Sequence, residues 1–241
     1  MEKIFVITLF ETPERLDEFK VNNRNLNFEI SYGVYGKSLN LDDLVDKGLT
    51  TPGLVYTKGA IGLAFSHVKL WDFCIKNEMP ITICEDDAIL HSDFLEKSNA
   101  LISKVKGDFD IILWGWNFDS ILNIESNENI GISTILSDPE KMCQSVTSYK
   151  SSDIEPTLHR LHNAFGTMCY TITPAGARKF LGDFIPLENS IVEIPRLGAI
   201  PDIGIDVKLN KKYKSTKSYV SFPPLALSKN ERDKSTVQTK D

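Results

Sequence analysis

A short apolar segment that ends in three consecutive carboxylates constrains the fold of this chain most strongly. Residues 79–88 have the sequence MPITICEDDA, in which Ile81, Thr82 and Ile83 precede the acids. A β-branched run of this length predicts a buried strand that carries acidic side chains at its carboxyl end. In open α/β sheets, ligands bind in the crevice outside the carboxyl ends of the strands. We therefore expect a ligand site here, and the alternative is a strand that ends in a solvated acidic turn.

The three acids, Glu85, Asp86 and Asp87, also indicate a divalent cation. Adjacent carboxylates repel one another, so keeping them together usually requires a cation or a raised pKa. Hard oxygen ligands beside a diphosphate suit Mg²⁺ or Mn²⁺. The motif by itself is compatible with both a metal site and an acidic turn.

Length and charge restrict the classes of function. The 241 residues include 41% hydrophobic and 25% charged residues, which are ordinary globular values, and they suffice for one large α/β domain or two small ones. The net charge of −6 argues against nucleic-acid binding and against contact with bulk anionic membrane. A basic run at Lys211, Lys212, Lys214 and Lys217 is most simply a solvated face. Its alternative is attraction of a diphosphate or weak peripheral contact with a membrane.

The cysteines and the N-terminus bear on the cellular compartment. The four cysteines have neither CxxC spacing nor histidines at zinc-ligand spacing. Cys74 and Cys84 lie in apolar contexts, which predicts buried, reduced thiols and a reducing compartment. The N-terminal apolar run is too short for a signal peptide, and no run has the length of a membrane span. We expect a cytoplasmic protein, with location at the inner face of the membrane as the alternative.

Apolar patterning predicts a chain in which strands and helices follow one another, as in an α/β protein. The predicted strands are residues 3–9, 28–35, 81–83, 108–116 and 165–173, and the predicted helices are residues 42–48, 58–77, 92–105 and 174–181. Residues 119–153 are rich in Asn, Ser and Glu, so we expect an irregular region there. From residue 228 the chain is charged, and we expect a flexible tail.

Two helix starts carry candidate ligand-binding residues. Thr12 is a candidate N-cap before Pro13, and Arg15 in the first turn is placed to meet an anionic ligand, its alternative being a solvated surface residue. Glycines 59 and 62 open the helix at 58–77 and permit a phosphate to approach backbone N–H groups. Ser66 and His67 follow in mid-helix, where a histidine is more often a structural residue.

Four motifs in a fixed order resemble glycosyltransferase family 25, which includes bacterial lipooligosaccharide galactosyltransferases and is related to collagen galactosyltransferases. They are GxxGxxxSHxxxW at 59–71, EDDA at 85–88, GTxxYxITPxGARKFL at 166–181, and PPL with a later Ser-Thr pair at 223–236. The opening strand with Arg15 is also similar to the start of the family. The resemblance covers most of the chain and thins between residues 119 and 153.

The resemblance implies a single α/β domain with a GT-A-like fold, in which a Rossmann-type mixed sheet is flanked by helices. Its nucleotide-sugar half would be residues 1–118 and its acceptor-side half residues 119–227. It implies transfer of a hexose with inversion, usually galactose from UDP-galactose, to a glycan or glycolipid such as lipooligosaccharide. Asp87 would then hold Mn²⁺ or Mg²⁺, with Glu85 as a second candidate ligand. Glu85 would also contact the ribose or uridine side of the donor, and Asp86 would serve either role. Glucosyl transfer by the same fold is an alternative.

An inverting displacement needs a carboxylate that takes the proton of the acceptor hydroxyl from the opposite face of the sugar. Asp206, after Gly204, is our first candidate for this base, and Asp202 is the second. The alternative for both is a helix N-cap or a turn acid.

Three positions depart from the family pattern. Ala60 and Leu63 stand where Glu and Cys are frequent, and Met168 stands where His is common. These departures raise a second hypothesis, a non-catalytic homologue that binds a nucleotide sugar or a glycan. A third hypothesis, metal-assisted phosphate-ester hydrolysis, is weaker because the chain has only four histidines.

Overall fold

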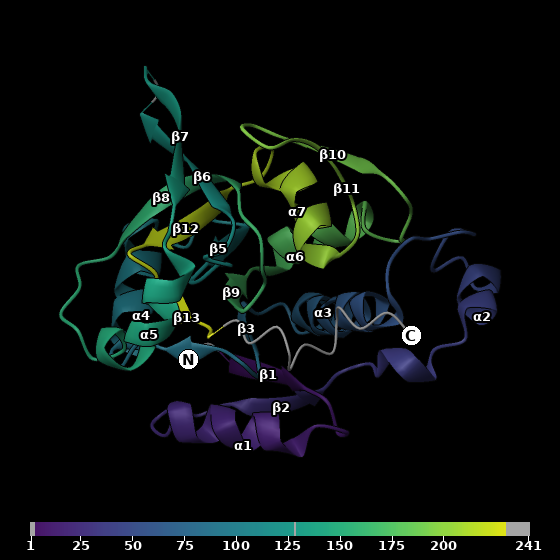
Figure 1. The fold of residues 1–241 in the computed structure, drawn as a ribbon, viewed down its shortest axis with the longest axis horizontal. Helices are drawn as coiled ribbons and strands as arrows, with labels where there is room; N and C mark the ends of the chain where they lie inside the picture. Colours follow the sequence, from purple (N-terminus) through teal and green to yellow (C-terminus); the bar gives the residue numbers. More distant parts are fainter. Residues whose placement is uncertain (1–2, 128, 230–241) are drawn as a thin grey trace.

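The computed structural model describes residues 3–127 and 129–229, and within them nine strands form one mixed sheet (Figure 1). The order across the sheet is β2-β1-β3-β9-β5-β12-β8-β6-β7, and helices flank it. The predicted class, a single α/β domain with a mixed sheet between helices, is confirmed. The expected tail falls mainly on residues 230–241, which lie outside the described residues.

The elements have the following bounds. The strands of the main sheet are β1 (Lys3–Thr8), β2 (Glu29–Tyr32), β3 (Ile81–Glu85), β5 (Ile111–Leu113), β6 (Ile121–Asn127), β7 (Gly131–Leu136), β8 (Thr157–Asn163), β9 (Cys169–Ile172) and β12 (Ser218–Phe222). Two small sheets pair β4 (Ile89–Leu90) with β13 (Ala226–Leu227) and β10 (Ile191–Ile194) with β11 (Gly198–Pro201). The helices are α1 (Pro13–Asn22), the 3₁₀ turn η1 (Gly36–Ser38), α2 (Leu41–Asp46), α3 (Lys58–Lys76), α4 (Phe94–Lys104), α5 (Pro139–Tyr149), α6 (Pro174–Gly182) and α7 (Ile205–Tyr213).

Parallel pairing brings the ends of β1 and β3 to one edge of the sheet. β1 lies between β2 and β3 and runs parallel to both, with Ile7 opposite Glu85. All residues of β1 after Lys3 are buried, as expected for a parallel strand covered on both faces. The chain after β1 turns into α1 at the same edge, so Arg15 and the acidic segment meet there.

Strand β9 connects the predicted halves of the chain, residues 1–118 and 119–227, by backbone pairing. It is inserted antiparallel between β3 and β5, with Cys84 opposite Cys169 and Leu113 opposite Tyr170. β12 then pairs parallel with β5. In the main sheet, β9 from after residue 119 therefore lies between β3 and β5 from before it, so the two parts of the chain share this sheet.

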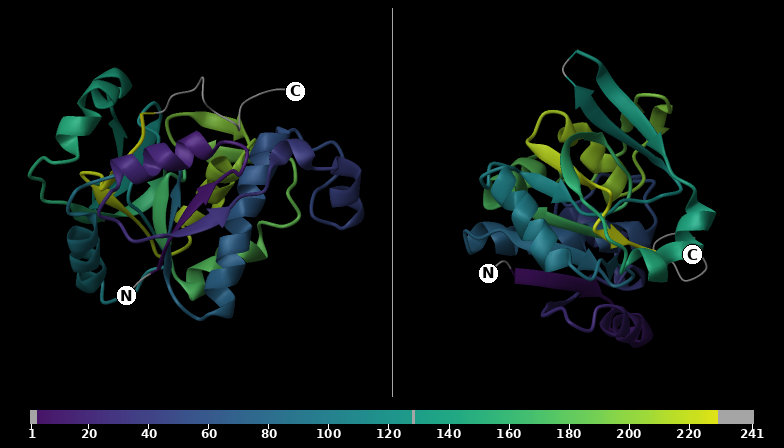
Figure 2. Two further views of the ribbon diagram at one scale, coloured as in Figure 1. Left: turned by 90° about the horizontal axis from the view of Figure 1, so that it is seen from below. Right: turned by 90° about the vertical axis from the view of Figure 1, so that its left-hand side faces the viewer.

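The prediction of an irregular region at 119–153 is wrong. This stretch forms the antiparallel β6–β7 hairpin and helix α5, and Figure 2 shows the hairpin projecting at the end of the molecule opposite α1. β7 is an edge strand, and its residues all retain some exposure. The prediction also missed β8. Two histidines, an arginine and an asparagine in this strand obscure the alternation of apolar and polar residues by which strands are predicted.

Most buried apolar side chains form one cluster between the sheet and the packed helices, and a second, smaller cluster contains Ile121, Phe165, Val192, Ile194 and Val207. The largest fully buried side chains of the first cluster include Trp71, Trp114, Trp116 and Tyr170. All four cysteines are free thiols, and Cys74 and Cys84 are buried, as predicted. Across residues 3–127 and 129–229, no helix has the length and apolar character needed to cross a membrane.

Candidate active site

The candidate site lies at the carboxyl ends of β1 and β3, where Arg15 meets the acidic segment. Arg15 donates from Nε to Asp86 Oδ1 at 2.7 Å, and its terminal nitrogen lies 2.5 Å from the same oxygen. Asp86 is buried, so this ion pair is largely shielded from water. The anion that Arg15 meets in the structure is thus a carboxylate of the site itself. Thr12 occupies the N-cap position of α1, but its side chain makes no capping hydrogen bond.

Glu85 is oriented by two neighbours. Thr167 Oγ1 donates to Glu85 Oε1 at 2.5 Å, and His67 Nε2 lies 3.6 Å from the same oxygen. Burial acts to raise the pKa of Glu85, but His67, Thr167 and the positive charge of Arg15 outweigh it, and the pKa lies below the ordinary value. Glu85 is therefore an ionised carboxylate with one oxygen already engaged.

His67 lies behind Glu85 with no exposed surface. Its Nδ1 is 2.8 Å from the Tyr170 hydroxyl, which also accepts a hydrogen bond from Trp71 Nε1 at 2.8 Å. A hydroxyl that accepts from Trp71 has its own proton for Nδ1, which leaves the ring proton on Nε2, facing Glu85. His67 can therefore influence a ligand only through Glu85.

The glycines and Ser66 of α3 pack against the segment 34–36. A Cβ on Gly62 would overlap the Val34 carbonyl oxygen, and a Cβ on Gly36 would lie 2.7 Å from the Gly59 nitrogen. Ser66 Oγ accepts from the Val34 N–H at 2.8 Å and donates to the Gly62 carbonyl at 2.7 Å. These contacts give Gly62 and Ser66 a packing role that the sequence did not indicate.

Asp87 is the exposed member of the acidic segment. Its Oδ2 accepts a hydrogen bond from Ser228 Oγ at 2.8 Å, although 141 residues separate the two in sequence. Removal from bulk water and the charge of Glu85 raise the pKa of Asp87 to about 6, against opposing contributions from Ser228 and Arg15. Because the side chain reaches solvent, we expect water to screen part of this effect.

The site fits a cation with few protein ligands. The described residues contain no group of three His, Cys, Asp or Glu side chains that could hold a metal ion. Asp86 is paired with Arg15 and Glu85 with Thr167, so Asp87 is the carboxylate that faces solvent. Mg²⁺-type sites often use one or two carboxylates together with substrate phosphates. The arrangement fits such a shared site better than a closed protein cage.

Asp206 lies in the first turn of α7 and approaches the acidic segment from the other side. Its Oδ2 accepts from the Gly166 N–H at 3.1 Å and its Oδ1 from the Val207 N–H at 3.0 Å. Burial raises the pKa of Asp206 above its ordinary value, these two hydrogen bonds offset part of the effect, and the charge of Glu85 adds to it. Each carboxylate oxygen retains a lone pair for a further hydrogen bond.

Asp202 has a different environment. It is fully buried, accepts hydrogen bonds from the Tyr56 hydroxyl and from Ser190 Oγ, and lies 3.9 Å from the buried Lys208 ammonium. The structure therefore separates the two candidate bases: Asp206 is partly exposed next to Glu85, and Asp202 belongs to an enclosed polar cluster.

The loop between β8 and β9 connects the two acidic groups. Gly166 binds Asp206 and the adjacent Thr167 binds Glu85. Gly166 has a φ of +86°, which favours glycine. Sequence reasoning did not assign a role to Thr167 or Ser228. The GT pair of the motif at 166–181 was a signal for Thr167, whereas Ser228 had none.

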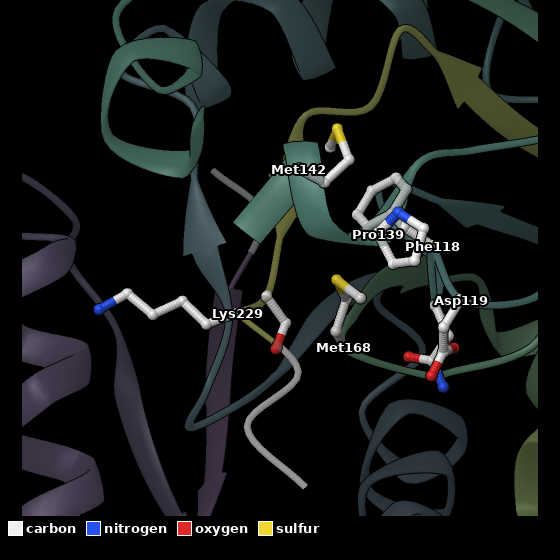
Figure 3. A pocket seen from close by; sticks show the side chains of 8 residues that line it. Phe118, Asp119, Pro139, Met142, Met168 and Lys229 are labelled. Atoms are coloured by element: carbon white, nitrogen blue, oxygen red, sulfur yellow. The ribbon is translucent and has the colours of Figure 1, made fainter. Parts of the chain in front are cut away.

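A shallow pocket adjoins Asp87 (Figure 3). It lies between the β5–β6 loop, the start of α5 and the residues after β13. Met168 lies at its centre in the figure, with Met142 above and Asp119 to one side. The lining residues are Asn117, Phe118, Asp119, Pro139, Met142, Met168, Ser228 and Lys229.

The basic run lies at the end of α7 and after it. Lys212 pairs with Asp183 and Lys217 pairs with Asp108, while Lys211 donates to Ser190 Oγ at 2.6 Å. Much of the positive charge of the basic run is thus paired within the protein, which favours the interpretation that the run is a solvated surface.

A mixed sheet flanked by helices, with acids at the end of one of its parallel strands, is consistent with a Rossmann-like glycosyltransferase fold. The model of glycosyltransferase family 25, described as an LPS biosynthesis protein, matches residues 1–193, and the chain belongs to this family. The resemblance seen in the sequence motifs is confirmed at the level of the family. The match ends before α7, so Asp206 lies outside it. A search of curated proteins finds no match.

Proposed function

We propose that this chain is a metal-dependent, inverting hexosyltransferase that transfers galactose from UDP-galactose to a glycan acceptor such as lipooligosaccharide. Membership of the family supports glycosyl transfer in LPS biosynthesis. The more specific proposal, metal-dependent hexose transfer, rests on the different environments of the three acids. Glu85 and Asp86 are engaged by protein groups, and Asp87 presents its carboxylate to solvent.

The residues have distinct proposed roles. A cation on Asp87 would neutralise charge on the diphosphate as the glycosidic bond breaks. Arg15 fixes Asp86, while Thr167 and His67 fix Glu85 for hydrogen bonding to the donor. Asp206 accepts the proton of the attacking hydroxyl. Its raised pKa suits a general base, because proton transfer is most effective when the pKa approaches the working pH.

One observation favours a second candidate, a homologue that binds a nucleotide sugar without turnover. Both oxygens of Asp206 already accept backbone hydrogen bonds at the start of a helix, as a structural acid would. Galactose and glucose differ at one hydroxyl, so a glucosyl donor is the alternative within the first proposal.

The test of the donor site is a thermal-shift titration with UDP, with and without Mn²⁺. A ligand that binds only the folded protein raises the melting temperature, by about 5 to 10 °C at a hundredfold excess over Kd for a chain of this size. We expect this shift to require Mn²⁺ and to vanish in Asp87→Asn. The matched control is Asp46→Asn, an exposed carboxylate at the end of α2. A full shift in Asp87→Asn would contradict the proposed donor site.

Turnover separates the two candidate functions. UDP release from UDP-galactose and from UDP-glucose is measured for the native protein and for Asp206→Asn. We expect Asp206→Asn to retain the UDP shift and to lose at least a hundredfold in rate, which is within the usual contribution of a general base. UDP binding without turnover of either donor in the native protein would instead support the binding homologue.

A further inference from the structure

Cys84 and Cys169 lie directly opposite each other in the β3–β9 ladder, and their side chains meet inside the protein. Their sulfur atoms are 3.3 Å apart, although the two residues are 85 positions apart in the sequence. Neither residue has any exposed surface. None of the roles assigned above to the acidic segment involves either thiol.

The backbone hydrogen bonds place these cysteines where antiparallel side chains come closest. The Glu85 N–H donates to the Met168 carbonyl at 2.9 Å, one position further along the ladder. Hydrogen-bonded positions alternate with non-hydrogen-bonded ones, so Cys84 and Cys169 form a non-hydrogen-bonded pair. The Cα atoms of such a pair are about 4.5 Å apart. This separation lies within the range of about 4.4 to 6.8 Å that disulfides adopt.

The next pair on the same face of the ladder shows that this register is well fixed. Thr82 and Thr171 are also opposite each other, and their hydroxyl oxygens are 2.6 Å apart. Trp114 Nε1 donates to the Thr171 hydroxyl at 2.8 Å, and the Trp114 N–H donates to the Cys169 carbonyl at 2.9 Å. The two thiols are therefore held against each other by their surroundings.

The cysteine pair lies at the end of the ladder. β3 ends at Glu85 and β9 begins at Cys169, so the pairing of these two strands stops directly after the thiols. Local opening at the end of an element has a lower free-energy cost than opening of its centre. A small reagent can therefore reach the thiols through a transient opening, whereas a bulky one is excluded by their burial.

We propose that Cys84 and Cys169 are an oxidation site that reacts with hydrogen peroxide and closes to a reversible cross-strand disulfide. One thiol reacts as its thiolate, so that an S–O bond forms, the O–O bond breaks, and the released hydroxide takes up the thiol proton as water. The second sulfur then attacks the sulfenic acid, the S–S bond replaces the S–O bond, and a second water leaves. The two sulfurs lose two electrons in total, and the peroxide receives them.

The bond would join β3 to β9 beside the candidate active site. Cys84 precedes Glu85, and Cys169 follows Met168, whose carbonyl binds the Glu85 N–H. A thiol reductant would restore the resting state, in which both residues are thiols. This inference does not depend on the proposed glycosyl transfer.

The test uses the full chain with Cys143→Ser, because Cys143 is exposed and would react independently. The folded protein is treated with hydrogen peroxide, which is then removed with catalase. The remaining thiols are alkylated in urea, and peptides are mapped by mass spectrometry. We expect one intramolecular disulfide, between Cys84 and Cys169, that dithiothreitol reverses, with Cys74 recovered as a thiol.

The same reaction in urea is the reference for a chain without the β3–β9 pairing. The unfolded chain should favour the Cys74–Cys84 disulfide, because the loop that this bond closes is much shorter and its closure costs less entropy. A change of partner from Cys74 to Cys169 on folding would thus reflect the geometry of the ladder.

Variants and melting temperatures provide a second measurement. A bond between residues this far apart in sequence restricts the unfolded chain, so oxidation should raise the melting temperature by about 5 to 10 °C. Cys84→Ser and Cys169→Ser should each abolish both the disulfide and this rise. Cys74→Ser is the matched control, a buried thiol on α3, and should retain both.

Three outcomes would overturn the inference. The first is a disulfide that includes Cys74 in the folded protein. The second is the absence of any disulfide at peroxide concentrations that oxidise the unfolded chain. The third is a melting temperature that falls on oxidation, which would show that the ladder does not accommodate the bond. UDP binding enters none of these measurements, so the proposed function is tested separately.

Discussion

The Arg15–Asp86 ion pair is the most enclosed charge pair of the acidic site. The side chain of Asp86 is 8% exposed and that of Arg15 20%. A carboxylate buried to this degree is costly unless it is paired, because water no longer solvates its charge. Arg15 therefore holds Asp86 in position and supplies the charge that pairs with it.

Removal of Arg15 should destabilise the protein. Arg15→Ala leaves Asp86 buried without its partner, and we expect the free energy of unfolding to fall by about 3 kcal/mol in urea denaturation. The matched control is Lys3→Ala, which removes an exposed partner of Glu29 and should cost less than about 1 kcal/mol. Equal losses in the two variants would show that the buried pair with Asp86 stabilises the fold no more than an exposed pair does.

At this scale the sequence predicted the position of the three acids at the end of a buried strand but not the residues that contact them. Glu85, Asp86 and Asp87 are consecutive, and a strand-end location follows from the apolar run before them. Their partners Thr167 and Ser228 are 82 and 141 residues away from the acids that they bind, and no local pattern encodes such contacts. The packing role of Gly62 was missed for the same reason, since it depends on the backbone of another segment.

Gly62 in helix α3 lies so close to the backbone of residues 34–36 that a larger side chain would not fit. A Cβ on Gly62 would lie 2.9 Å from the Gly36 nitrogen and would also overlap the Val34 carbonyl. Alanine is a better helix former than glycine by about 1 kcal/mol, but overpacking against rigid backbone costs about 1 to 3 kcal/mol. The steric effect should therefore prevail.

We expect Gly62→Ala to lower the free energy of unfolding by about 2 kcal/mol, measured by urea denaturation. Gly182, the last residue of α6, is the matched control because a Cβ there would meet no atom within 4 Å. Gly182→Ala should be neutral or stabilise the protein by up to about 1 kcal/mol. A stabilising Gly62→Ala would indicate that η1 moves freely relative to α3.

Elements with a strong apolar pattern were predicted, whereas the neighbouring strands β8, β6 and β7 at one side of the sheet were not. β1, β3 and α3 are largely buried, so their sequences contain the apolar patterns by which buried strands and helices are predicted. In β6 and β8, Asn123 and Asn163 are buried and hydrogen-bonded to each other. Because both residues are polar, the sequence pattern does not identify these two positions as buried. Such mutual pairing of polar groups is a tertiary property and has no signature in one segment.

At the scale of the whole molecule, the two parts of the chain are interleaved. β9 lies between β3 and β5, and β12 pairs with β5, so the predicted nucleotide-sugar and acceptor-side parts share hydrogen-bonded neighbours. Opening either part would break backbone pairing in the other.

Hydrogen exchange followed by mass spectrometry should reveal this interdependence. We expect peptides from β3, β5, β9 and β12 to open with the same free energy, within about 1 kcal/mol, because they belong to one cooperative unit. β7, which has one neighbour and exposed residues, should exchange at a lower free energy and serves as the internal reference. Earlier exchange of β9 and β12 than of β3 and β5 would mean that the two parts unfold separately.

The loop that carries Gly166 and Thr167 has a consequence for how this protein diverges. Because neighbouring residues of one loop hold Asp206 and Glu85, the separation of these acids is set by a few backbone torsions. An insertion into this loop would displace Asp206 and Glu85 together and disrupt the candidate active site. Lineages that acquire new sugars are therefore expected to conserve the length of this loop and to vary the walls around it, beginning with Met168 and Asn117.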